Sequence, residues 1–161
     1  MRVEYINPFV ESTFSILSEV VDPDVKRGEL FLKPTTMSIK GVAALVGLAG
    51  DVEGRVLFDM TKEAAMFVAE AMTRDMGITM AGFDDMAKAT IQELANMITA
   101  QAVTKLHDLG FKFDLTPPAL FTGDNMEVAT DLGKVEALIV PMIFSGGMEF
   151  EVNVAIRERI R

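Results

Sequence analysis

The sequence lacks the residues on which several classes of protein chemistry depend. It contains no cysteine and a single histidine, His107, in 161 residues. Without cysteine, the chain has no disulfide, no thiolate metal site and no cysteine nucleophile. One histidine cannot form a histidine cluster for zinc. The sequence therefore excludes thiol catalysis and the common zinc sites, and it suits a reducing compartment.

Stacking aromatic residues, positive charge and long apolar runs are also scarce. There is no tryptophan and only one tyrosine, which argues against a surface that stacks nucleic-acid bases. The net charge of −9 argues against nucleic acid or an anionic membrane surface as a partner. No stretch approaches 18 uninterrupted apolar residues, and the N-terminus carries no apolar signal segment. We therefore expect a cytoplasmic protein with no nucleic-acid partner and no membrane span.

What the sequence does contain is the material for one folded domain. Half of the residues are hydrophobic, which supplies a sizeable core and excludes global disorder. The length fits a single domain, and no linker is long enough to separate two. We expect residues 1–161 to form one domain.

Two helices are predicted in the first half of the chain. The first is expected to have Asn7 as its N-cap and Pro8 at its first position, a favoured pairing. It is expected to end at residues 22–24, which have the composition of a turn. The second is expected to begin at Thr61.

Six segments have the composition of β-strands. They are residues 28–34, 42–48, 55–58, 111–115, 135–144 and 148–156. Gly50, Asp51 and Gly54 are expected to supply the turn between the second and third of these. The order of the segments predicts an α+β domain, with about three helices packed on a largely antiparallel multi-stranded sheet.

The last strand segment has a regular alternation of apolar and polar residues. Such a pattern predicts a strand with two different faces, and Met148, Phe150, Val152 and Val154 are expected on the apolar one. The polar face is expected to consist of Glu149, Glu151 and Asn153.

The third helical segment, residues 84–109, has two contrasting faces. Asp84 suits its N-cap, and Gly110 can end it in a left-handed conformation. At about 100° per residue, the face expected to pack on the core contains Ile91, Leu94, Ala95, Ile98, Ala102, Leu106 and Leu109. The opposite face, expected to be exposed, contains Glu93, Asn96, Met97, Ala100 and Thr104.

Glu93 and Asn96 are the candidate site residues of this exposed face. Residues three apart on a helix have Cβ atoms about 5–6 Å apart, so the carboxylate and the amide can address one target. Asparagine is a poor residue for a helix interior, so its presence indicates selection for something other than helix stability. The same Glu-x-x-Asn pattern occurs at Glu4 and Asn7, where a helix cap explains the asparagine, so the pattern alone is weak.

Met97 and Ala100 lie next to this pair. An apolar residue that flanks polar ones on an exposed helix face is typical of a docking surface. A solitary exposed methionine, however, needs no explanation, and the pattern alone leaves both interpretations open. His107 lies eleven positions beyond Asn96, about 16 Å along the helix, so it does not share this site.

Residues 91–99, Ile-Gln-Glu-Leu-Ala-Asn-Met-Ile-Thr, resemble the signature helix of the CheC/CheX/FliY family of phosphatases, which act on the chemotaxis response regulator CheY. Residues 47–56 resemble the glycine-containing hairpin of that family, and residues 116–118 resemble its proline step. Residues 6–12 resemble the opening helix of the CheX branch. The resemblance covers the whole chain and implies a CheC/CheX-like fold.

The number of motifs points to one branch of this family. CheC and FliY typically carry two active helices. Here the first helix has Glu11 but Phe14 where an asparagine would be needed, so only one motif is present. The chain also departs from the family pattern at Ala89, where an aspartate or serine is common. A single motif is typical of CheX, which forms homodimers with exchange of β structure.

The resemblance implies a reaction in which a partner supplies much of the chemistry. The reaction is hydrolysis of the aspartyl phosphate of a CheY-like receiver domain, which provides the phosphorylated aspartate, Mg²⁺ and a lysine. Glu93 would engage that lysine through a charge-assisted contact. Asn96 would orient the attacking water, since phosphoryl transfer depends mainly on positioning and electrostatics. No cofactor or metal of this chain's own is expected.

Two other functions would use the same residues. A non-catalytic adaptor would bind the phosphorylated receiver domain and leave its phosphate intact. A structural subunit, as FliY-like proteins are in the flagellar switch, would be recognised by copurification with switch components.

Overall fold

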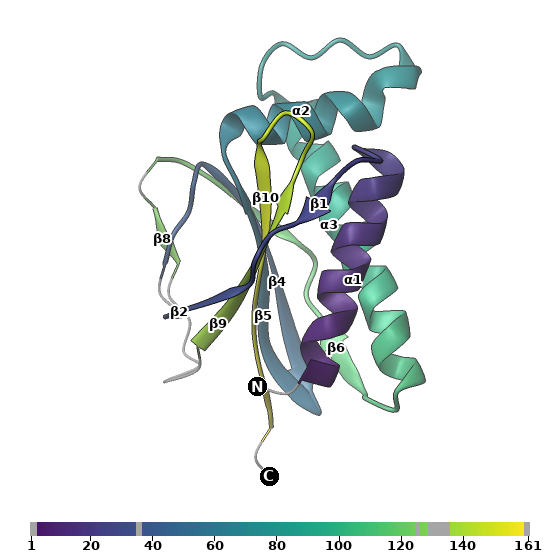
Figure 1. The fold of residues 1–161 in the computed structure, drawn as a ribbon, viewed down its shortest axis with the longest axis vertical. Helices are drawn as coiled ribbons and strands as arrows, with labels where there is room; N and C mark the ends of the chain where they lie inside the picture. Colours follow the sequence, from purple (N-terminus) through teal and green to yellow (C-terminus); the bar gives the residue numbers. More distant parts are fainter. Residues whose placement is uncertain (1–2, 35–36, 125, 129–135, 160–161) are drawn as a thin grey trace.

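The computed structural model describes residues 3–34, 37–124, 126–128 and 136–159. Within these residues, three helices pack on an antiparallel sheet, as Figure 1 shows. The predicted α+β architecture is therefore confirmed. Residue 135, the first of the predicted strand 135–144, lies outside the described residues.

The sheet has eight strands, and all of its neighbours are antiparallel. They are β1 (Lys26–Arg27), β2 (Phe31–Pro34), β4 (Val42–Gly50), β5 (Val52–Met60), β6 (Phe113–Leu115), β7 (Ala119–Thr122), β9 (Glu136–Ile143) and β10 (Glu149–Glu158). The order is β1-β9-β10-β5-β4-β6, with β2 also paired to β9 and β7 also paired to β4. Two short strands, β3 (Met37–Ser38) and β8 (Glu127–Val128), pair separately.

The helices are α1 (Val3–Val20), α2 (Lys62–Thr73) and α3 (Asp85–Asp108), and a short 3₁₀ turn, η1 (Arg74–Met76), follows α2. In Figure 1, α1 and α3 lie side by side along one face of the sheet, and α2 crosses at its end. Helix α2 was expected to begin at Thr61 and begins one residue later, because Thr61 is its N-cap and its hydroxyl accepts the N–H of Ala64 at 3.1 Å. No helix among the described residues is long and apolar enough to cross a membrane.

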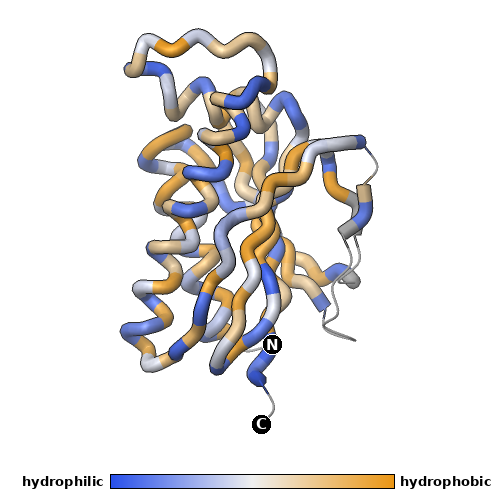
Figure 2. The backbone as a smooth tube through the Cα atoms, turned by 180° about the vertical axis from the view of Figure 1, so that it is seen from behind, coloured by the Kyte–Doolittle hydropathy of each residue, from blue (hydrophilic) through white to orange (hydrophobic). Residues whose placement is uncertain are grey.

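The main core lies between the helices and the sheet. One cluster of buried side chains runs from Tyr5 in α1 to Ile156 in β10 and includes residues of all three helices. Phe58 and Phe150, on the neighbouring strands β5 and β10, contribute rings whose centroids are 5.8 Å apart. Figure 2 shows apolar residues concentrated along the central strands and recurring along the helices. This core fixes α3 against the sheet.

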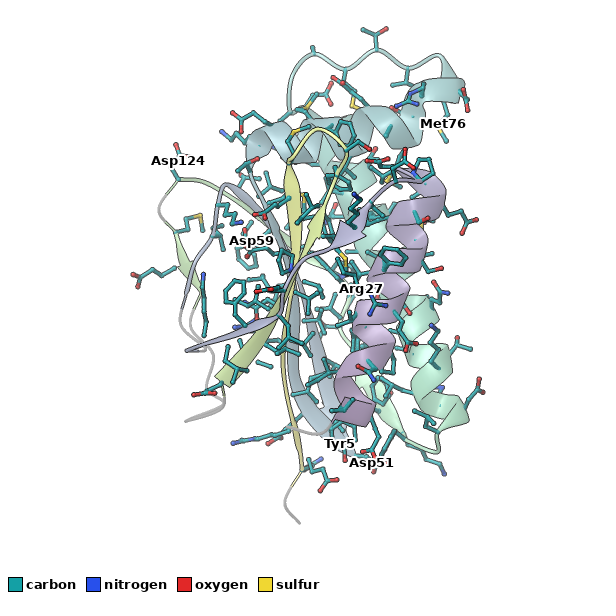
Figure 3. All side chains as sticks on the ribbon, in the orientation of Figure 1. Tyr5, Arg27, Asp51, Asp59, Met76 and Asp124 are labelled. Carbon is teal, nitrogen blue, oxygen red and sulfur yellow. The ribbon has the colours of Figure 1, made fainter. Side chains whose placement is uncertain are left out.

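Helix α1 begins earlier than the sequence predicted. Asn7 is not an N-cap but an exposed residue inside the helix, which extends back to Val3 and includes Pro8. Tyr5 gives the physical reason: it is buried, and its ring meets that of Phe111 edge-on with centroids 4.8 Å apart. Burial of this turn stabilises the helix more than the missing hydrogen bond at Pro8 disfavours it. Figure 3 labels Tyr5 at this end of α1.

Gly54 belongs to strand β5 and not to the turn, which Gly50 and Asp51 supply without it. Its φ is +146°, and a Cβ there would lie 2.0 Å from the carbonyl oxygen of Ala155 in β10. The prediction that Gly54 is a turn residue is therefore wrong. The close approach of β10 requires glycine at this position.

The polar residues of β10 lie on a face of the sheet that the chain itself covers. Glu151 and Asn153 are buried, and Glu149 is partly exposed. The chain covers this second face of the sheet with its own segments, since Ile39 is buried there and its N–H bonds to the carbonyl of Met126 at 2.8 Å. An alternating pattern shows that two faces differ, but it does not show whether both are covered.

This second face contains a cluster of charged and polar groups, of which Lys40 is exposed and the others are buried. The ammonium of Lys40 donates to Oε1 of Glu151 at 2.5 Å, and Nη1 of Arg55 donates to Oδ1 of Asn153 at 2.9 Å. Asp59 lies directly opposite Glu151 in the β5–β10 pairing. Partial desolvation lowers the pKa of Lys40, but its hydrogen bond to Glu151 and the nearby negative charge outweigh that effect and raise it. In Figure 3, Asp59 lies on the side of the sheet away from α1 and α3.

Candidate functional site

Helix α3 begins at a well-formed cap. Oδ1 of Asp84 accepts the N–H of Ala87 at 2.9 Å, and Oδ2 accepts the N–H of Ala81 at 3.1 Å. These backbone hydrogen bonds hold the pKa of Asp84 below its ordinary value, and the bond from Ala87 has the largest effect. The predicted N-cap is confirmed, and its ionised carboxylate also suits the positive end of the helix dipole.

The back of α3 is packed as the sequence predicted, except at its last position. Six of the seven residues assigned to this face are buried: Ile91, Leu94, Ala95, Ile98, Ala102 and Leu106. The seventh, Leu109, is 58% exposed. It stands just beyond the end of the helix, where the chain turns at Gly110 with φ +92°, so the helical periodicity no longer places it.

The front of α3 presents Glu93 and Asn96 to solvent. Both residues are exposed and stand one turn apart near the middle of the helix. Among the residues that the structure describes, neither side chain has a hydrogen-bond or ion-pair partner. A carboxylate and an amide on this face are thus both available to a second molecule.

The two predicted docking residues differ in exposure. Ala100 is exposed, in line with its expected place on the front face. Met97 is only partly exposed and packs against the main core. The bulk of the Met97 side chain therefore stabilises this domain, and only part of it is open to a partner.

Contacts at its sides brace α3 without covering its front. Nζ of Lys105 lies 3.3 Å from Oε2 of Glu11 in α1, which is the glutamate considered for a second motif. Nε2 of Gln92 donates to the carbonyl of Pro118 at 3.5 Å, so the proline step lies against the helix. These contacts hold the helix that carries Glu93 and Asn96 in a fixed orientation.

The other candidate residues do not join this site. His107 is exposed near the end of α3, with its ring 5.5 Å from that of Phe113. Glu4 and Asn7, the second occurrence of the pattern, are exposed in the first turns of α1. Within the described ranges, no group of three or more histidine, aspartate or glutamate side chains is placed to hold a metal ion.

The sequence analysis missed one residue of this face, Met86. It is 45% exposed and lies seven positions before Glu93. Seven residues correspond to almost two full turns, so this spacing was the signal that could have placed Met86 on the same face.

The fold is shared by a protein of known structure. The crystal structure of a CheC-like superfamily protein from Shewanella sp. PV-4 is similar, with a TM-score of 0.82, at 24% identity over 98% of this chain and 99% of that chain. At this identity the likeness shows the fold alone. It defines the class as CheC-like.

Sequence comparison identifies the family within that class. Residues 42–142 match the family model described as chemotaxis phosphatase CheX. A chain in the crystal structure of a CheX–CheY–BeF₃–Mg²⁺ complex from Borrelia burgdorferi is 42% identical, with a TM-score of 0.81 over 98% of this chain and 100% of that chain. The CheY-P phosphatase CheX of Thermotoga maritima is 25% identical over 161 residues, which is 98% of each chain. The chain belongs to the chemotaxis phosphatase CheX family.

Proposed function

We propose that this chain hydrolyses the aspartyl phosphate of a CheY-like receiver domain and so ends a chemotaxis or related two-component signal. The observation that carries the proposal is the pair Glu93 and Asn96, exposed one turn apart on a braced helix. Membership of the CheX family supports it, as does the 42% identical relative in a complex with CheY, BeF₃ and Mg²⁺.

In this proposal, Glu93 anchors the partner. Its carboxylate forms a charge-assisted hydrogen bond with a lysine of the receiver domain, which orients α3 over the phosphorylated pocket. Because Glu93 is exposed before binding, the contact requires no rearrangement of this chain. Desolvation in the interface makes the contact stronger than an ordinary surface ion pair.

Asn96 is the residue that we assign to the chemical step. Its amide carbonyl accepts a hydrogen bond from a water molecule and holds that water in line with the phosphorus–oxygen bond to be broken. The water oxygen bonds to phosphorus as the bond to the aspartate oxygen breaks. The products are inorganic phosphate and a free aspartate carboxylate on the partner, and no covalent intermediate forms on this chain.

The partner supplies the metal ion in this scheme. Mg²⁺ on the receiver domain neutralises charge that develops on the transferring phosphoryl group. This chain contributes position and hydrogen bonding, so we assign it no cofactor of its own. A neutral amide suffices, because positioning alone accounts for a large part of such rate enhancements.

A non-catalytic adaptor for the phosphorylated receiver domain is the alternative, and one assay separates the two functions. A panel of receiver domains is phosphorylated, and phosphate release is followed with the protein at a tenth of the receiver concentration. We expect the release rate from at least one receiver to rise about tenfold or more, because a catalyst turns over. An adaptor would leave the rate unchanged or slow it.

We further propose that residues 1–161 act as one phosphatase domain in the cytoplasm. Supporting this, the hydroxyl of Tyr5 in α1 bonds to the carboxylate of Glu158 at the end of β10, so both ends of the described chain join one core. Unfolding in urea is then expected to be a single transition by both fluorescence and circular dichroism.

We also propose a homodimer. Leu30 and Leu32 are 64% and 58% exposed, and Phe31 is exposed as well. They lie on or beside β2, which pairs only with β9 among the described residues. A free edge with apolar side chains is a ready surface for a second copy. Light scattering is expected to give about twice the chain mass of 17.6 kDa, and a monomer mass at micromolar concentration would contradict the proposal.

A further inference from the structure

Met86 extends the exposed face of α3 beyond the Glu93–Asn96 pair. At 100° per residue, Met86 lies about 20° around the helix axis from Glu93 and about 10 Å along it. Ala89 lies between them and is exposed, and Ala100 continues the strip past Asn96. Five exposed residues thus form one strip along α3, which we call the front strip: Met86, Ala89, Glu93, Asn96 and Ala100.

The backbone that carries Met86 is fixed. Its carbonyl accepts the hydroxyl of Thr90 at 2.8 Å, and the next residue, Ala87, donates its N–H to the Asp84 cap at 2.9 Å. The side chain itself is 45% exposed. Met97 contrasts with it, since Met97 packs against the main core. Met86 is therefore the methionine of α3 whose apolar surface is available.

The size of a protein interface places Met86 within reach of the partner. A stable interface buries about 800 Å² on each side, which corresponds to a disc of about 16 Å radius. Met86 lies ten residues before Asn96, about 15 Å along the axis. Of the large exposed hydrophobic side chains in the described part of the chain, Leu109 is the other one next to α3. It stands just beyond the end of the helix, thirteen residues after Asn96 and sixteen after Glu93.

We propose that Met86 is a positioning residue, which docks against an apolar patch of the receiver domain beside its phosphorylated pocket. The inference rests on the proposed function, because it takes that receiver domain as the occupant of the front strip. Met86 lies on the same exposed face of α3 as Glu93 and Asn96. A receiver domain that binds around the Asn96 amide therefore also covers Met86, and for this reason we take the receiver domain as its partner. The flexible, polarizable methionine side chain suits such an apolar contact.

The test separates affinity from turnover. The full-length protein is compared with Met86→Ala, Met86→Leu and the control Met76→Ala, which removes a methionine that is 68% exposed at η1. Figure 3 labels Met76 just beyond the end of α2. KM and kcat are measured with the receiver domain that is dephosphorylated fastest, and Kd with the same receiver in its beryllium fluoride form. Both are measured at 50 and 500 mM salt.

We expect Met86→Ala to raise KM and Kd about fivefold to tenfold while kcat changes less than twofold. Met86→Leu is expected to restore wild-type values, because it keeps the apolar volume. Met76→Ala is expected to have no effect. The loss should be the same at both salt concentrations, since an apolar contact is not screened.

Wild-type KM and Kd in Met86→Ala, alongside a functioning wild-type enzyme, would overturn the inference and leave the proposed function standing. Binding that weakens in Met86→Ala, in a protein that does not accelerate phosphate release, would instead overturn the proposed function and support the role of Met86 as a contact. Absence of any receiver binding by the wild type would overturn both.

Discussion

Asp59 and Glu151 face each other across the β5–β10 pair, and both side chains are almost completely buried. Oδ1 of Asp59 accepts the backbone N–H of Lys40 at 3.0 Å. Within the part of the chain that the structure describes, its Oδ2 and the Oε2 of Glu151 have no hydrogen-bond partner. Burial first, and then the charge of Glu151, raises the pKa of Asp59 to about 6.

The direction of this pKa shift makes the contribution of Asp59 to the stability of the domain fall as pH rises. The pKa of Asp59 is about 6 in the folded state against 3.8 as its ordinary value, so the folded state binds the proton more tightly. The stabilisation is present below about pH 4 and is lost as pH rises through about 6. Above that pH, the ionised carboxylate is buried, and its Oδ2 has no partner among the residues described.

Asp59→Asn is therefore expected to stabilise the protein at neutral and alkaline pH. The amide keeps the acceptor for Lys40 and removes the buried charge. We expect the free energy of unfolding at pH 8 to rise by about 1–3 kcal/mol, with little difference at pH 4. Urea unfolding at both pH values measures this. As the matched control, Asp75→Asn, at an exposed position, should follow the wild-type profile, and an Asp59→Asn protein less stable than wild type at pH 8 would refute the assignment.

Gly54→Ala is expected to disrupt the pairing of β5 with β10. A Cβ at Gly54 would lie 2.0 Å from the carbonyl oxygen of Ala155, and the residue has φ +146°. The strand must shift or strain, so we expect a loss of about 2–4 kcal/mol in the free energy of unfolding. The control is Gly146→Ala in the β9–β10 turn, where a Cβ meets no atom within 4 Å. A Gly54→Ala protein as stable as that control would contradict the register.

Glu93→Lys is expected to weaken binding to the receiver domain far more than it changes the fold. The side chain is exposed, so the melting temperature should stay within a few degrees of wild type. Facing a lysine of the partner, the new ammonium would repel it, and we expect Kd to rise about tenfold to a hundredfold. Isothermal titration at 50 and 500 mM salt measures this. A loss of affinity that did not shrink at high salt would contradict an electrostatic role.

Much of the fold and the faces of α3 could be predicted from the sequence, because local rules decide them. The cap at Asp84 and the apolar period from Ile91 to Leu106 depend on residues within one helix. Those rules failed where distant packing decides the outcome. Tyr5 packs against Phe111, which is distant in the sequence, and this contact extends α1 to residues before Asn7, its expected cap. Glycine is required at position 54 because β10, about a hundred residues later in the chain, approaches it closely.

Sequence patterns also could not predict the burial of the polar face of β10 or the presence of strand β7. Alternation separated Glu151 and Asn153 from the apolar face, but their burial depends on segments such as Ile39 that the pattern does not connect to them. Strand β7 follows the proline step and pairs with β4, and its four residues are too few for a periodic signal. Asn96 and Glu93 could be proposed from sequence because helical spacing alone brings them together.

The central claim is that Asn96 takes part in the chemical step. The most direct test compares the turnover of the Asn96→Ala protein with its affinity for the receiver domain. With a phosphorylated receiver domain, we expect kcat to fall about a hundredfold or more, while Kd for the beryllium fluoride form changes less than threefold. Thr104→Ala, an exposed change two turns further along the same helix, is the control and should retain wild-type kcat. Phosphate release by Asn96→Ala at the wild-type rate would contradict the account.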